Sequence, residues 1–236
     1  MSGMSERTSL LIGDEGIEKL RRSSVILCGC GAVGGYALEG LVRSGVGRIR
    51  VVDHDVFSES NLNRQILATT FTVGRPKVEV ACERARSINP DVDISGMDVL
   101  VNESTVSEII DGEFDVLVDA IDTLRNKTAL LRCASEKGIR TFSSMGAALH
   151  MDTQAVRVAP LMKTKTCPLA ASLRKALRDC DTSMITAVYS EEPPVVKPSE
   201  RDDHGKSVLG SLPAVPAVFG FTLANETIRF LLEKSL

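Results

Sequence analysis

The sequence predicts an α/β fold, a Rossmann-like, doubly wound and mostly parallel sheet with a glycine-rich nucleotide-binding loop, on two observations. An apolar, β-branched run at 25–28 is typical of a buried strand, and a helical pattern begins soon after it. Three glycines between them have G-x-G-x-x-G spacing: Gly29, Gly31 and Gly34. A second strand, 49–52, ends at Asp53, nineteen residues beyond Gly34, which completes a βαβ unit.

These glycines suit a phosphate site for separate reasons. The first allows a tight turn, the second lets the backbone approach a phosphate, and the third lets the helix pack on the strand. The helix N–H groups then face an anion, and Asp53 can accept a hydrogen bond from a ribose hydroxyl. The alternative is a glycine-rich turn that only packs a helix on a sheet.

Length and composition indicate one globular domain. The chain has 236 residues, of which 43% are hydrophobic and 25% charged. We expect one domain over 1–236, with an N-terminal arm (1–23), a nucleotide-binding core (24–160) and a substrate-facing segment (161–236). That last segment includes a flexible polar connection at 191–211 and a C-terminal helix, with no apolar stretch long enough to span a bilayer.

Charge and cysteine usage exclude several classes of protein. The net charge of −3 and the isoelectric point near 5.7 provide no global basic field, so a contact with RNA must come from a local patch. The six cysteines contain no C-x-x-C pair, which argues against zinc ribbons and disulfide scaffolds. The apolar run at 10–12 is too short for a secretory segment, and we expect a cytoplasmic protein.

The remaining elements follow from periodicity and end signals. Helices are expected where apolar residues recur at helical spacing: 15–20, 34–44, 77–88, 123–137, 168–178 and 213–232. Further strands are expected at 115–123, which is apolar and then acidic at its carboxyl end, and at 140–144. After the second of these, the small residues at 145–148 could let a substrate approach the edge of the sheet.

Two cations follow the nucleotide motif closely. Beyond Asp53 the chain forms a polar loop that carries Arg64, and the next helix begins at Lys77. A nicotinamide cofactor does not need these cations, whereas a triphosphate does, because they offset charge on the α-phosphate and on leaving pyrophosphate. The alternative is a pair of surface cations. Arg7, in the N-terminal arm, is either solvated or part of such a site.

Asp122 lies at the carboxyl end of the strand 115–123, at the edge where open α/β sheets bind ligands. Mg²⁺ usually takes one or two carboxylates together with phosphate oxygens and waters, so Asp122 is a candidate magnesium ligand. A helix cap is the alternative, and the two roles are compatible.

The segment 163–178 is locally basic, with five cations and no acid: Lys163, Lys165, Arg174, Lys175 and Arg178. Pro168 suits the first position of a helix whose apolar stripe leaves Arg174, Lys175 and Arg178 outside it. Such a pattern is either a solvated helix face or a contact for the phosphate backbone of an RNA.

With the motifs at these spacings, the chain resembles the ThiF/MoeB/HesA superfamily, which consists of ATP-dependent adenylating enzymes related to ubiquitin activation. The motifs that carry the resemblance are G-x-G-x-x-G, Asp53, 60–65, 74–79, 88–90 and 119–122. The resemblance implies an ATP site that includes Asp53, Asp55 and Asn61. It implies phosphate contacts from Arg64 and Lys77, and magnesium at Asp122. It also implies a homodimer in which Arg7 reaches the neighbouring protomer's site.

Within the superfamily the chain is most similar to the branch that dehydrates threonylcarbamoyladenosine in tRNA. The segments 7–13, 163–178, 188–193 and 210–220 carry this similarity. It implies a tRNA partner, with a sulfur-relay protein as a second possible partner. The cations at 163–178 would then contact tRNA.

Two other functions remain as alternatives. One is adenylation of the C-terminus of a ubiquitin-like sulfur carrier, although that branch commonly carries C-x-x-C pairs that this chain lacks. The other is a non-enzymatic nucleotide or NAD sensor, which the combination of Arg64, Lys77 and Asp122 disfavours. A nucleophilic Cys167 is less expected than an inert packed thiol, and the short segment after Arg178 makes a role for Cys180 doubtful.

Overall fold

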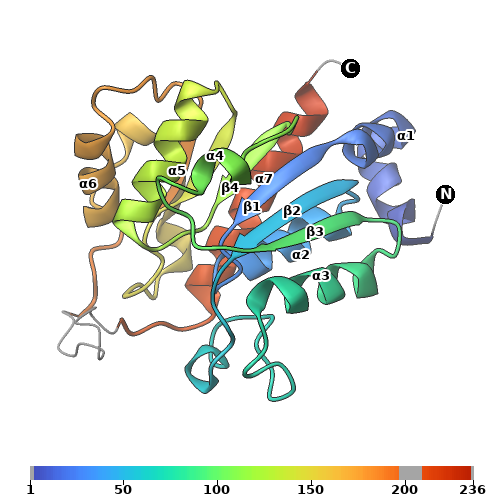
Figure 1. Cartoon of the computed structure of the whole chain (residues 1–236), viewed down its shortest axis with the longest axis horizontal. Helices are drawn as coiled ribbons and strands as arrows, with labels where there is room; N and C mark the ends of the chain where they lie inside the picture. Colours follow the sequence, from blue (N-terminus) through green and yellow to red (C-terminus); the bar gives the residue numbers. More distant parts are fainter. Residues whose placement is uncertain (1–2, 197–208, 235–236) are drawn as a thin grey trace.

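The computed structural model describes residues 3–196 and 209–234 and contains a seven-stranded sheet with the order β3-β2-β1-β4-β5-β7-β6 (Figure 1). Neighbouring strands run parallel except β6 and β7, which pair antiparallel. The strands are β1 (Ser24–Cys28), β2 (Arg48–Asp53), β3 (Asp93–Asp98), β4 (Val116–Asp119), β5 (Thr141–Ser144), β6 (Val156–Pro160) and β7 (Ile185–Ser190).

Helices connect these strands and cover the sheet. The α-helices are α1 (Glu6–Arg22), α2 (Gly34–Arg43), α3 (Lys77–Ile88), α4 (Val106–Ile109), α5 (Leu124–Glu136), α6 (Pro168–Ala176) and α7 (Ala214–Glu233). Short 3-10 turns are η1 (Gly3–Ser5), η2 (Glu59–Asn61), η3 (Thr153–Ala155) and η4 (Leu161–Lys163). None of the helices in the described ranges has the length and apolarity to cross a membrane.

The side chains of β1 alternate between two apolar cores, which shows that helices cover both faces of the sheet. Val25 and Leu27 belong to one core, which also contains residues of α1, α2, α3 and α7. Ile26 and Cys28 belong to a second core, shared with α4 and α5. Because successive side chains of a strand point to opposite faces, this division confirms the doubly wound α/β fold that the sequence predicts.

A third apolar cluster joins α6 to the far end of the sheet. Leu173 and Leu177 are buried against Leu131 of α5 and against Ile185 and Ala187 of β7. Figure 1 shows α5 and α6 side by side at this end, away from α1 and α3. The apolar stripe predicted for 168–178 therefore packs inward, and Pro168 is the first residue of its helix, as predicted.

Three strands are absent from the sequence prediction: β3, β6 and β7. The first two are the edge strands of the sheet, and most of their residues are at least partly exposed, so they have no continuous apolar run. The N-terminal helix also begins earlier than predicted, and Gly13, at φ 71°, forms a kink between its two helical segments. Of the connection predicted at 191–211, residues 197–208 lie outside the described part of the chain.

Candidate active site

The glycine loop lies at the carboxyl ends of β1, β2 and β4. Gly29 has φ 96° and donates its N–H to the Val52 carbonyl at 2.8 Å. A Cβ on Gly34 would lie only 1.7 Å from the Gly29 carbonyl oxygen, whereas the nearest atom to a Cβ on Gly31 is Gln65 Nε2 at 3.8 Å. Turn geometry and close packing therefore require the first and third glycines, while the backbone at Gly31 has space beside it.

Asp53 fixes the start of this loop. It is the last residue of β2, and its carboxylate accepts N–H groups from Cys30 at 2.6 Å and from Asp55 at 3.0 Å. The group predicted to bind ribose thus already orders the glycine loop and the loop that follows β2. Burial raises the pKa of the Cys28 and Cys30 thiols, so these two cysteines are neutral packing groups.

Lys77 begins α3 and is only 6% exposed. Its Nζ lies 2.8 Å from Asp55 Oδ2, and its backbone N–H donates to the Asp55 carbonyl at 2.9 Å. The Asp55 side chain is about half exposed. The ammonium is therefore buried beside a carboxylate that faces solvent, an arrangement in which an incoming phosphate can share or replace the counter-ion.

Arg64 is held by its own loop. Its Nη1 donates to the Ser60 carbonyl at 2.7 Å and to Asn63 Oδ1 at 2.9 Å. Asn61 Oδ1 accepts the Ser58 N–H at 3.1 Å in a reciprocal capping box, so this predicted nucleotide ligand also stabilises the turn. Hydrogen bonds within the loop therefore hold both side chains in place.

Asp122 is exposed beyond the end of β4, as its predicted metal-binding role requires. Its Oδ1 accepts the Thr123 hydroxyl at 3.0 Å. Thr123 occupies the N-cap position of α5 and makes no side-chain cap hydrogen bond to the described helix. The structure therefore assigns the cap position to Thr123 and not to Asp122.

A second group of potential metal ligands lies nearby, since Asp53, His54 and Asp55 place one ligand atom each within 4.8 Å of one another. The Asp53 oxygens accept backbone N–H groups, and Asp55 pairs with Lys77. These side chains are already used to build the site, and we assign no metal to them.

Arg7 lies on the first turn of α1, is exposed, and has no hydrogen-bond or ion-pair partner among residues 3–196 and 209–234. On the same helix, the Leu10 and Leu11 side chains are 81% and 85% exposed. The structure does not bring Arg7 to the glycine loop of its own chain.

The five cations predicted to contact tRNA fall into two groups. Lys163, Lys165, Lys175 and Arg178 are exposed, and within the described residues none of their side chains has a polar partner. Arg174 is half-buried, and its Nη1 donates to the Thr164 carbonyl at 3.0 Å and to the Thr164 hydroxyl at 2.5 Å. The structure thus gives Arg174 a bracing role that its place in the basic segment does not reveal.

Sequence reasoning missed a buried polar cluster beneath the site. Lys127 Nζ lies 2.5 Å from Asp119 Oδ2, and the Ser143 hydroxyl donates to the same oxygen at 2.6 Å. All three side chains are fully buried. The available signal was a lysine at a position that faces the core in the helix predicted at 123–137.

The two doubtful cysteines are poor nucleophiles in this structure. Cys167 is buried at the N-cap of α6 among apolar residues. Burial raises the pKa of the Cys180 thiol, with Asp179 acting in the same direction. A raised pKa keeps the thiol protonated near neutral pH, so the geometry favours packing over sulfur chemistry.

Comparisons with known proteins match this architecture over almost the whole chain. The ThiF family model matches residues 5–236. The chain is 34% identical to the tRNA threonylcarbamoyladenosine dehydratase of Bacillus subtilis (strain 168), over 96% of this chain and 94% of that protein. It is 30% identical to the protein of the same name from Escherichia coli (strain K12), over 97% of this chain and 93% of that protein.

A solved structure of the E. coli tRNA N6-threonylcarbamoyladenosine dehydratase in complex with ATP has a TM-score of 0.86 and 29% identity, covering 95% of this chain and 92% of that chain. The sulfur carrier protein adenylyltransferase of Thermus thermophilus is 42% identical, but only over 47% of this chain and 41% of that protein. Similarity to the dehydratases therefore extends over both halves of the chain.

Proposed function

The chain belongs to the ThiF family, and from this premise we propose that it catalyses the ATP-dependent dehydration of threonylcarbamoyladenosine in tRNA. The observation that carries the proposal is the extent of similarity: relatives with this activity in their names match 93% to 97% of this chain. The sulfur carrier adenylyltransferase of T. thermophilus matches less than half of it.

The chemistry needs an activated carboxylate and no protein nucleophile. The threonyl carboxylate attacks the α-phosphorus of ATP, and pyrophosphate leaves. The carbamoyl group then attacks the acyl carbon, the bond between that carbon and the AMP oxygen breaks, and the carbamoyl nitrogen loses a proton. The carboxylate oxygen leaves with AMP, so the nucleoside loses the atoms of one water.

The chain's own residues supply charge and position for the first step. Lys77 and Arg64 offset the charge that builds on the α-phosphate and on pyrophosphate. Asp53, Asp55 and Asn61 hold the nucleotide and the loops around it. The ordered contacts of Arg64 and the burial of Lys77 support this assignment, because prearranged donors need little reorganisation during the reaction.

A magnesium ion fits the donor set at Asp122. The carboxylate is exposed at the carboxyl edge of the sheet, and a single carboxylate with phosphate oxygens and waters is a usual Mg²⁺ environment. When bound, the ion would offset negative charge on the phosphates.

A homodimer completes the proposed site. The exposed Leu10 and Leu11 side chains lie on the same helix as Arg7, and their burial against a second copy would contribute about 25 cal/mol per Å². In such a dimer Arg7 reaches the phosphates of the neighbouring protomer. A tRNA substrate also implies a cytoplasmic location, and a sulfur-relay partner stays a prediction.

The test is incubation with ATP, Mg²⁺ and tRNA that carries threonylcarbamoyladenosine, followed by mass analysis of the nucleosides under mild conditions. We expect an ATP-dependent loss of one water from that nucleoside, with AMP released. An unchanged nucleoside, together with pyrophosphate exchange that depends on the C-terminal tail of a ubiquitin-like carrier, would overturn the proposal in favour of the sulfur-carrier reaction.

A further inference from the structure

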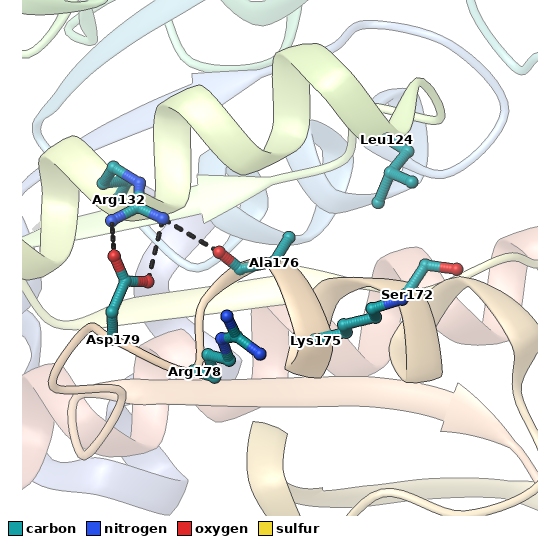
Figure 2. Close-up of a pocket in the computed structure, with 7 residues that line it drawn as sticks. All are labelled: Leu124, Arg132, Ser172, Lys175, Ala176, Arg178 and Asp179. Atoms are coloured by element: carbon teal, nitrogen blue, oxygen red, sulfur yellow. Dashed lines mark hydrogen bonds and ion pairs between the residues drawn. The ribbon is translucent and has the colours of Figure 1, made fainter.

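A cleft of about 650 Å³ lies between parts of α5 and α6, which pack against each other beneath it (Figure 2). Leu124 and Ser172 line one end, and Arg132 and Asp179 line the other. Leu124 begins α5 two residues after Asp122, so the cleft starts beside the carboxyl edge of the sheet and extends away from it. A molecule that reacts near Asp122 could therefore continue along this cleft.

One ion pair closes the far end of the cleft. Arg132 Nη1 and Nη2 lie 2.9 and 3.0 Å from the two Asp179 oxygens, and Nη2 also donates to the Ala176 carbonyl at 2.8 Å. The hydrogen bonds from Arg132 hold the pKa of Asp179 below its ordinary value. Among the described residues, Asp179 is the only carboxylate that lines the cleft, and it is therefore ionised and already satisfied near neutral pH.

The cleft carries a surplus of positive charge. Lys175 and Arg178 line it between the two ends, and in the described part of the chain neither has a hydrogen-bond or ion-pair partner. Three cations thus accompany one carboxylate, in a protein whose overall net charge is −3. Free cations in an open cleft can pair with a chain of phosphates at no cost of breaking an internal ion pair.

We propose that this cleft binds the phosphate backbone of the tRNA substrate, with Lys175 and Arg178 as the contacts and Asp179 as a counter-charge that limits the affinity. The proposal rests on the proposed function, and it assigns the cleft to RNA positioning and not to chemistry. No aromatic side chain is present among the described residues that line it, so they offer no stacking surface for bases. Backbone contacts of this kind position an RNA without reading its sequence.

The first experiment measures binding of unmodified tRNA by fluorescence anisotropy, without ATP, at several salt concentrations. The double variant Lys175→Gln and Arg178→Gln should bind at least roughly tenfold more weakly at low salt, and its slope of log K against log salt should fall by about two. The matched control is Arg229→Gln on α7, an exposed cation on the opposite side of the sheet. Wild-type affinity and slope in the double variant would overturn the proposal and favour an acidic protein partner.

The second experiment replaces Asp179 by Asn. Removing one negative charge while Arg132 stays should tighten tRNA binding roughly two- to fivefold. A merely structural ion pair predicts no such gain, so unchanged or weaker binding would remove Asp179 from the proposal. Neither measurement needs the modified nucleoside or ATP, so failure of dehydration with intact binding would count only against the proposed function.

Discussion

The two groups of cations in this protein differ in how the fold holds them. At the glycine loop, Lys77 is buried beside Asp55 and Arg64 is fixed by its own loop. At the α5–α6 cleft, Lys175 and Arg178 are exposed, and no described residue pairs with them. Charges that stabilise a transition state work best when prearranged and desolvated, whereas backbone recognition needs only mobile, salt-sensitive charge. We infer that the two groups of cations perform separable tasks.

The largest effect should come from Lys77, the buried cation near the glycine loop. Lys77→Ala should slow pyrophosphate release by roughly 100- to 1,000-fold, because it removes a prearranged charge from the reacting phosphates. Arg75→Ala, two residues earlier, changes a partly exposed cation that pairs with Glu83, and as the control it should leave the rate nearly unchanged. A Lys77→Ala rate within a factor of about two of wild type would remove Lys77 from the reaction.

Two substitutions in the glycine loop should have different effects, one on folding and one on ATP binding. Gly34→Ala should lower the free energy of unfolding by about 1–3 kcal/mol or more, because its Cβ would collide with the Gly29 carbonyl. Gly31→Ala should fold normally and lose ATP affinity, because space beside its backbone is what a phosphate needs. Thermal denaturation and ATP titration measure the two effects, and full ATP affinity in Gly31→Ala would argue against a phosphate there.

Subunit mixing tests whether one chain alone supplies all the residues of the phosphate site. If Arg7 acts across a dimer, an Arg7→Ala chain mixed with an Asp122→Ala chain should recover about a quarter of wild-type activity, because half of the dimers are mixed and each has one intact site. Both parents should be inactive. A mixture as inactive as its parents would argue against the shared site.

The smallest effect should come from the thiols. Cys180→Ser should change the dehydration rate by less than about twofold, because the raised pKa keeps the Cys180 thiol protonated near neutral pH. Rate measurements at neutral and mildly alkaline pH give the check. An alkaline rise in rate that is lost in Cys180→Ser would reveal a thiolate role that the geometry does not support.

The parts of the fold with strong local signals could be predicted from the sequence. Residues that mark the start or end of an element locate the glycine motif, the strand ends at Asp53 and near Asp122, and the helix that begins at Pro168. The edge strands β3 and β6 have no apolar run that a sequence pattern could detect. Pairing with β2 and β7 stabilises them instead.

The sequence could predict which residues belong to the candidate site, but not which side chains contact one another there. Sequence spacing brings Lys77 to a helix start, but only the fold shows Asp55 as its counter-ion. Similarly, Arg174 and Lys175 are adjacent cations, yet one braces Thr164 and the other faces the cleft. The buried pair of Lys127 and Asp119 joins a helix to a strand end, a contact that one-dimensional patterns do not specify.

Steady-state dehydration kinetics of two variants would test the separation of tasks most directly. For Lys77→Ala, kcat should fall and saturating tRNA should not restore it. For the double variant Lys175→Gln and Arg178→Gln, KM for tRNA should rise at least roughly tenfold while kcat stays close to wild type. A loss of kcat in the double variant, or recovery of Lys77→Ala at high tRNA concentration, would contradict the account.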